Sequence, residues 1–210
     1  PGLVDYVDFR ADDIGECAIS EGIFKPYQIL AVTFTNRAAG EMRERVAAML
    51  PDVDLDGLEM RTFHSFGAYI LRRYGERAGL SPSFCIYDDD DSLSLLSTVV
   101  TTLDKRNLRE IQKAISNAKD RGLDPDSPGL ESMLPDYDFR TAFRRYEEAL
   151  AISGNADFAD LICKSTQLLR DDKEVAGYFQ KRFRMVLVDE YQDSNRMQFE
   201  MLRSLVGPDT

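Results

Sequence analysis

The chain has 210 residues, enough for one large domain or two smaller ones with buried cores. A hydrophobic share of 43% is typical of a globular protein, and the apolar runs are too short to span a membrane. The formal net charge of −11 excludes a surface that binds nucleic acid over its whole extent, because neutralising phosphates requires clustered lysine and arginine.

The first predicted elements form a strand–turn–helix unit. Residues 29–34 are a compact apolar and β-branched run, which is typical of a buried parallel strand. Residues 37–50 carry apolar side chains at helical spacing, and Pro51 follows the end of this predicted helix. A second short strand at 59–62 precedes another helix at about 64–75, with Phe66, Ile70 and Leu71 facing inward.

A long helical stretch follows. The four aspartates at 88–91 indicate the start of a helix, because acidic residues favour the first turn, and a cation site is the alternative. Helices are predicted at 92–103, 107–120, 137–152 and 157–170. Strand character returns only at 184–188, and a polar turn and a helix at about 195–205 come after it. This order favours one parallel α/β domain interrupted by an inserted all-helical domain.

The sharpest chemical feature lies at the end of that last strand, where Asp189 and Glu190 follow an apolar run that predicts a buried strand. In open α/β sheets, ligands bind at the carboxyl ends of the strands. The first carboxylate can hold Mg²⁺, and the next can orient and deprotonate a water that attacks a γ-phosphate. An acidic turn without function is the alternative for such a pair.

Three segments resemble helicases of the UvrD/Rep/PcrA group. Residues 188–202, Val-Asp-Glu-Tyr-Gln-Asp-Ser-Asn-Arg-Met-Gln-Phe-Glu-Met-Leu, resemble motif II of that family. Residues 29–46 and 61–75 are similar to its motifs Ia and Ib, and shorter similarities occur at 114–119 and 157–161. The resemblance covers about residues 19–210, and several motifs in the right order make it specific.

The resemblance implies an incomplete P-loop NTPase-like (RecA-like) α/β domain with an inserted all-helical subdomain. The expected motor domain 1A comprises 1–87 and 171–210, and the expected subdomain 1B comprises 88–170. Within motif II, the resemblance assigns Asp189, together with Glu190, to Mg²⁺. It assigns Glu190 and Gln192 to catalysis, and Asp193 to coupling with neighbouring segments. It assigns to DNA binding a set of residues at the first two strand-to-helix turns: Thr33, Phe34, Thr35, Asn36, Arg37, Thr62, Phe63, His64 and Ser65.

Several of these residues also have structural interpretations. Phe34 is either a core residue or a platform on which an unpaired base stacks, and the resemblance favours the platform. A lone histidine such as His64 is more often structural, whereas the resemblance favours a DNA contact. Asn117 and Lys119 indicate either a helix surface or a part of the insertion that approaches duplex DNA.

The chain departs from the family at its amino end. An ATPase of this kind uses Gly-x-x-x-x-Gly-Lys-Ser/Thr to hold phosphates, and no such string occurs in the 210 residues. The corresponding positions, near residues 1–9, belong to an acidic segment that includes Asp5, Asp8 and Asp12. We expect this segment to repel a triphosphate. A truncation, a shifted reading frame and a degenerate paralogue all remain open as its origin.

The resemblance therefore implies the amino-terminal part of an ATP-dependent 3′–5′ DNA helicase acting in repair or replication. ATP and Mg²⁺ are its expected cofactors, single-stranded DNA and single-strand–duplex junctions its expected partners, together with a second motor domain. This chain alone is expected to be inactive and to bind neither cofactor tightly. The alternative is a non-catalytic DNA- or protein-binding module. The three widely spaced cysteines fit neither a disulfide framework nor a zinc site and predict a reducing cytoplasm.

Overall fold

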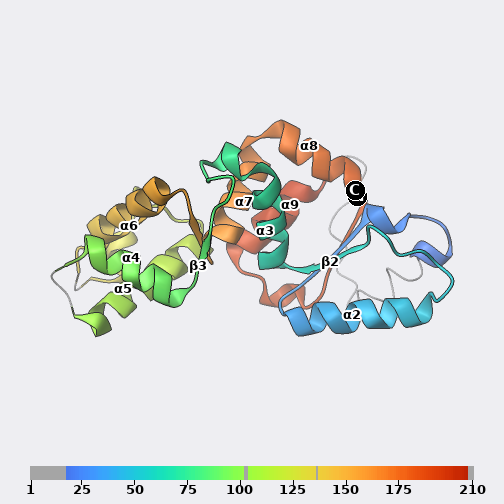
Figure 1. The fold of residues 1–210 in the computed structure, drawn as a ribbon, viewed down its shortest axis with the longest axis horizontal. Coiled ribbons are helices and arrows are strands. Elements are labelled where there is room, and N and C mark those ends of the chain that lie inside the picture. The colour runs from blue at the N-terminus through green and yellow to red at the C-terminus, as the bar shows by residue number, and fades with distance from the viewer. Residues whose placement is uncertain (1–17, 102–103, 136, 208–210) are drawn as a thin grey trace. The chain divides into compact units, whose positions relative to one another are not determined.

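The computed structural model describes residues 18–101, 104–135 and 137–207 (Figure 1). The strands are β1 (Ile29–Thr33), β2 (Glu59–Thr62), β3 (Ile86–Tyr87), β4 (Ala156–Asp157) and β5 (Met185–Val188). The α-helices are α2 (Asn36–Met49), α3 (Phe63–Tyr74), α4 (Asp89–Val99), α5 (Lys105–Asp120), α6 (Phe139–Ser153), α7 (Asp160–Asp171), α8 (Lys173–Arg182) and α9 (Arg196–Leu205). Short 3₁₀ helices include η3 (Leu130–Met133) and η4 (Tyr191–Asp193).

The main sheet has three parallel strands in the order β2-β1-β5. Every residue of the central strand β1 is buried, as its continuous apolar sequence predicts. One face of the sheet packs against α2, in a core that includes Ile29, Ala31, Met42 and Val46. Figure 1 shows α8 on the opposite side of the sheet, where Phe66 makes edge contacts with the rings of Phe179 and Phe183.

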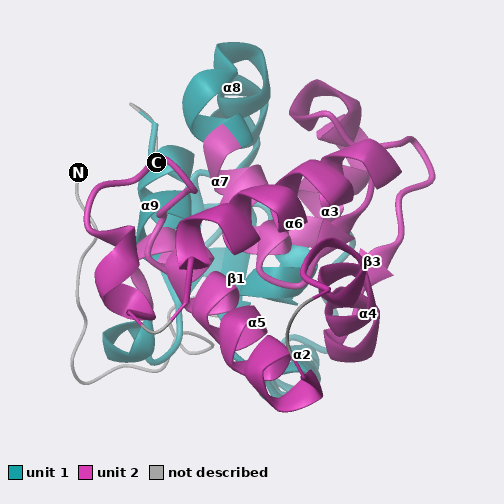
Figure 2. Cartoon of the chain, turned by 90° about the vertical axis from the view of Figure 1, so that its left-hand side faces the viewer, with its two compact units in different colours: residues 1–66, 168–194, 199–210 teal, residues 67–167, 195–198 magenta. Residues whose placement is uncertain are grey.

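The described chain divides into two compact units, coloured in Figure 2. Unit 1 contains residues 1–66, 168–194 and 199–210, and unit 2 contains 67–167 and 195–198. The core of unit 2 is formed by α4, α5 and α6, with the aromatic rings of Phe139 and Phe143 stacked 5.9 Å apart. The subdomain bounds expected from sequence, 1–87 with 171–210 and 88–170, stay a prediction.

The structure confirms the parallel α/β class and most elements to within a few residues, and it corrects three expectations. Helix α8 was not predicted, although Val175, Ala176 and Phe179 are buried on one side of it. The stretch 88–170 is not entirely helical, since β4 pairs with β3 in a two-residue parallel bridge too short to produce a sequence pattern. Strand β5 is half-buried rather than buried, because among the described strands it pairs only with β1. No described helix is both long enough and apolar enough to cross a membrane.

Candidate functional site at the carboxyl edge of the sheet

The three strands of the main sheet end at one edge within unit 1. Thr33 and Thr62 are the last residues of β1 and β2 and are register partners. Val32 pairs with Val188, so Asp189 follows β5 at the same level. Each strand continues directly into the polar segment that the sequence singled out. The edge therefore gathers the predicted DNA-binding and acidic segments in one region of one unit.

The first segment turns from β1 into α2. Thr33 is 2% exposed, so its hydroxyl faces the interior. Thr35 caps α2, and its Oγ1 accepts a hydrogen bond from the Ala38 amide at 3.1 Å. Asn36 and Arg37 are exposed on the first turn of α2, and the guanidinium of Arg37 lies 2.7 Å from the carboxylate of Glu41. Two of these polar residues shape the turn, and two face solvent beside the positive end of the helix dipole.

Phe34 lies partly in the core and partly at the surface. Its ring packs against Phe63 with the centroids 5.3 Å apart and the planes tilted by 52°. Phe63 is 1% exposed, whereas Phe34 is half-buried. Phe34 is thus fixed on one side by the core and keeps part of its surface at the edge of the sheet, which is the arrangement that an aromatic stacking residue requires.

The second segment turns from β2 into α3 through a reciprocal cap. The Ser65 amide donates to Thr62 Oγ1 at 3.1 Å, and the Thr62 amide donates to Ser65 Oγ at 3.0 Å. Between them lies half-buried His64. Burial lowers the pKa of its imidazole, so His64 is neutral at neutral pH and offers a hydrogen bond rather than a charge.

The third segment leaves β5 with both acidic residues. The Asp189 amide donates to the Val32 carbonyl at 3.0 Å, which fixes the position of this residue beside β1. Glu190 has φ 54° and ψ 42° and is the sole non-glycine residue of the described chain in the left-handed region. The backbone then forms η4, which leaves Gln192 and Asp193 exposed. Left-handed backbone is unfavourable for a residue with a β-carbon, and such strain is concentrated at functional sites.

The donor set at this edge fits Mg²⁺. Proteins bind Mg²⁺ through one or two carboxylates, with waters and phosphate oxygens completing the octahedron. Asp189 is half-buried at a strand end and Glu190 is exposed next to it, so two consecutive carboxylates lie at the carboxyl edge of the sheet. The segment expected in place of the phosphate loop, residues 1–9, lies outside the described residues.

Comparison with known proteins identifies the family. The family model for the UvrD/REP helicase N-terminal domain matches residues 17–210. The chain belongs to the UvrD/REP helicase family. It is 39% identical over 190 residues to the ATP-dependent DNA helicase UvrD1 of Mycobacterium leprae, an alignment that covers 86% of this chain and 24% of that protein. It is 38% identical over 189 residues to the ATP-dependent DNA helicase Rep of Escherichia coli, covering 88% of this chain and 28% of that protein.

This UvrD/REP chain thus spans about a quarter of the length of these two curated relatives.

The position of Lys119 differs from the sequence interpretation of a helix surface. Lys119 is 3% exposed and ion-paired inside unit 2, whereas Asn117 on the same helix is exposed. The helix cap formed by Asn195 and Gln198 was not predicted from sequence. Their spacing of three residues, which is that of a capping box, could have indicated it.

Proposed function

We propose that this chain is the part of an ATP-dependent 3′–5′ DNA helicase motor that holds single-stranded DNA and the acidic residues of ATP hydrolysis. The observation that carries the proposal is the shared edge of the sheet in this UvrD/REP chain. The segments that resemble motifs Ia, Ib and II follow β1, β2 and β5 at that edge. The names of the relatives, ATP-dependent DNA helicases, support the same activity.

In this proposal, the segments after β1 and β2 bind the DNA strand. Exposed Asn36 and Arg37 reach a phosphate together with backbone amides of the first turn of α2. Phe34 supplies a ring for stacking, and neutral His64 supplies a hydrogen bond. The buried or capping residues Thr33, Thr35, Thr62, Phe63 and Ser65 hold the two turns in shape.

In the same proposal, the segment after β5 acts in ATP hydrolysis. When bound, Mg²⁺ would neutralise the charge that develops on the phosphate oxygens. Asp189 holds the ion, and Glu190 accepts a proton from the attacking water. Gln192 and Asp193, exposed on η4, sense the nucleotide and pass its state to neighbouring segments. A second motor domain completes the site, and repair or replication is the setting.

The 210 residues contain no phosphate-loop string, so we propose that this chain alone binds ATP weakly and does not hydrolyse it. The purified chain should therefore show no rise in melting temperature with ATP and Mg²⁺. A saturable rise of several degrees would contradict this part of the proposal. The same missing string favours the second candidate, a non-catalytic DNA- or protein-binding module.

Binding of a fluorescent single-stranded oligonucleotide at low salt tests the DNA-binding part. Arg37→Ala is expected to weaken binding several-fold and to reduce the dependence of log K on log salt by about one phosphate contact. Arg45→Ala removes the same charge from the same helix two turns further from the sheet edge and is the matched control. Equal effects of both variants would show a non-specific charge effect, and no effect of either would favour the protein-binding module.

A further inference from the structure

A pocket with a volume of about 320 Å³ lies wholly within unit 2. Its lining comes from the first turn of α4, the middle of α5 and the segment that leads from β4 into α7. Buried Leu93 and Ile115 give the lining an apolar part, and Gln112 and Ser116 add polar groups. Pockets of this size and mixed lining are typical of sites that bind small molecules.

Phe158 lines this pocket as an exposed aromatic residue between two buried neighbours. It is 56% exposed, whereas Asp157 and Ala159 are each 7% exposed. Burying a phenyl ring is strongly favourable, so its exposure here costs stability. The backbone on both sides therefore decides where this ring lies, and much of its apolar surface stays open at the pocket.

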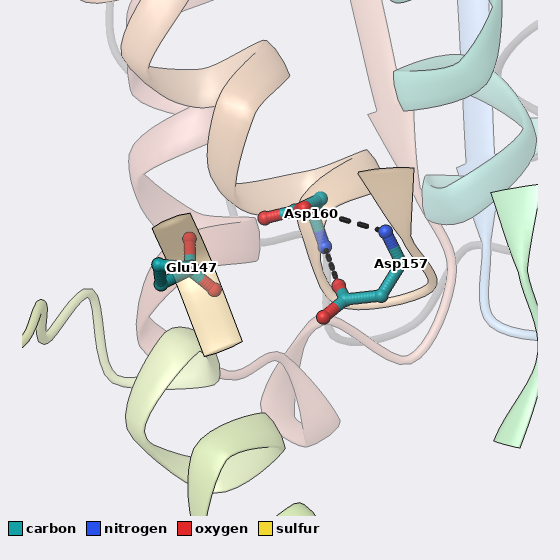
Figure 3. Close-up of side chains that lie close together, drawn as sticks. All are labelled: Glu147, Asp157 and Asp160. Carbon is teal, nitrogen blue, oxygen red and sulfur yellow. Dashed lines mark hydrogen bonds between the residues drawn. The ribbon is translucent and has the colours of Figure 1, made fainter. Parts of the chain in front are cut away.

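A reciprocal cap holds the backbone on both sides of Phe158. The Asp160 amide donates to Asp157 Oδ1 at 2.8 Å, and the Asp157 amide donates to Asp160 Oδ2 at 3.3 Å (Figure 3). The Lys119 ammonium lies 2.7 Å from Asp157, 2.9 Å from Asp160 and 2.6 Å from Glu147. Separating these buried charges would be costly, so the turn that carries Phe158 is rigid.

The rest of the lining carries charges of both signs. Asp89 and Asp90 are exposed on the first turn of α4, and Arg109 and Lys113 are exposed one turn apart on α5. None of these four side chains forms an ion pair with a residue that the structure describes. Gln112 Nε2 donates to the Asp89 carbonyl at 2.8 Å and fixes the start of α4 against α5. A ligand that satisfies both kinds of charge must carry hydrogen-bond donors and a negative charge.

The row of cations continues along α5 beyond the pocket. Lys105, Arg109 and Lys113 are four residues apart, which places them on one face of the helix at steps of about 6 Å. Lys105 is exposed and does not line the pocket. Arg106 beside it is also exposed and lies 3.9 Å from Glu110. In a chain with a net charge of −11, such a row favours a ligand with repeated negative charges, as in a phosphodiester backbone, over a single anion.

We propose that this pocket holds one unpaired nucleotide of a nucleic-acid strand. The base stacks on Phe158, and its amino group donates to Asp89 or Asp90. Its phosphate pairs with Arg109 or Lys113, and the neighbouring phosphates follow the cations of α5. Because a carboxylate only accepts hydrogen bonds, the pocket favours cytosine, which has an amino group at C4, over thymine, which has a carbonyl there. The site is separate from the sheet edge and does not depend on ATP hydrolysis.

Base preference tests the pocket directly. Fluorescence anisotropy compares binding of oligo(dC) and oligo(dT) of equal length to the 210-residue chain, at neutral pH and low salt. We expect oligo(dC) to bind several-fold more tightly. Stacking at the sheet edge tolerates any base, so the preference reports on the pocket. Combining Asp89→Asn with Asp90→Asn supplies groups that donate as well as accept, and should abolish the preference. Equal binding of both oligonucleotides to the unaltered chain would overturn the proposal.

Single substitutions test the ring and the cations. Phe158→Ala should weaken binding of oligo(dC) at least about fivefold. Ile152→Ala removes an 88% exposed side chain of the same unit outside the pocket lining and is its control. Arg109→Ala should lower the dependence of log K on log salt by about one phosphate contact, and Arg121→Ala, just after the end of α5, is the matched control. Effects as large in the two controls would overturn the proposal.

Two competitors identify the kind of ligand. The mononucleotide dCMP cannot follow the row of cations, so it should displace oligo(dC) only at a much higher concentration. Equally tight binding of dCMP would assign the pocket to a free nucleotide, and equal displacement by a polyglutamate peptide would assign it to a protein; either overturns the proposal. If Phe158→Ala weakens binding and Arg37→Ala does not, the proposed DNA site at the sheet edge fails and the pocket stands. The reverse result overturns the pocket alone.

Discussion

Thr33 and Thr62 are register partners at the ends of neighbouring parallel strands, and each opens a turn that leads into a helix. The two turns are built differently. Thr35 caps α2 alone, whereas Thr62 and Ser65 cap α3 reciprocally. The parallel register places both helix N-termini at one edge, so the shape of either turn affects a shared surface.

The reciprocal cap gives the first prediction. Ser65→Ala removes the acceptor for the Thr62 amide and should lower the free energy of unfolding by about 0.5–2 kcal/mol, as loss of a helix cap usually does. Urea denaturation measures the change. Ser97→Ala, the same substitution at an exposed position of α4, should change it by less than about 0.5 kcal/mol. Equal changes in both variants would mean that the cap contributes nothing specific.

The backbone of Glu190 gives the second prediction. Glu190→Gly should stabilise the chain by up to about 1 kcal/mol, because glycine tolerates the left-handed region. Glu190→Gln keeps the β-carbon and should leave stability unchanged. Both variants remove the carboxylate, so comparing their urea midpoints separates backbone strain from charge. If only the glutamine variant were more stable, the destabilisation at this position would come from the charge of the carboxylate and not from the backbone conformation.

The order of elements and the position of the polar segments at the ends of the strands could be predicted from sequence, because both depend on local patterns. The apolar run before Thr33 and the acidic pair after Val188 are each visible within a few residues. Interactions between distant segments could not be predicted. Lys119 is charged and followed by Asp120, which indicates a helix surface, and only the fold brings Asp157 and Asp160 to it. The left-handed conformation of Glu190 could not be predicted either, because a glutamate in the sequence does not indicate a positive φ.

Lys119 gives the third prediction. Burial alone would lower the pKa of its ammonium, but the charges of Asp160, Asp157 and Glu147 outweigh burial and hold the pKa well above its usual value. Lys119→Met removes the one cation at the centre of three carboxylates and should destabilise the chain by about 3–5 kcal/mol. Lys113→Met, at an exposed position of the same helix, should have little effect on thermal unfolding. A similar small effect of Lys119→Met would show that the cluster contributes little to stability.

Asp160 gives the last prediction, a dependence of stability on pH. The pKa of its carboxyl is raised to about 6. Burial is the largest cause and raises this pKa, the charge of Lys119 lowers it, Asp157 and Glu147 raise it, and Lys164 lowers it. Tyr146, whose hydroxyl donates to Asp157, completes the surroundings. Because the pKa is higher in the folded state than in the unfolded state, this group stabilises the fold most below pH 3.8. That stabilisation is lost as the pH rises through about 6.

Asp160→Asn removes this titration. The free energy of unfolding of the unaltered chain, relative to that of the variant, should therefore decrease between pH 5 and pH 7.5, the window that brackets a pKa of about 6. Asp157 does not titrate in this window, because Lys119 overcomes the effect of burial and lowers the pKa of that carboxyl. Urea denaturation at several pH values measures the difference, with Asp126→Asn at an exposed position as the matched control. A constant difference across the window would mean that Asp160 stays ionised, held so by Lys119, and that the buried cluster carries its excess negative charge at neutral and mildly acidic pH alike.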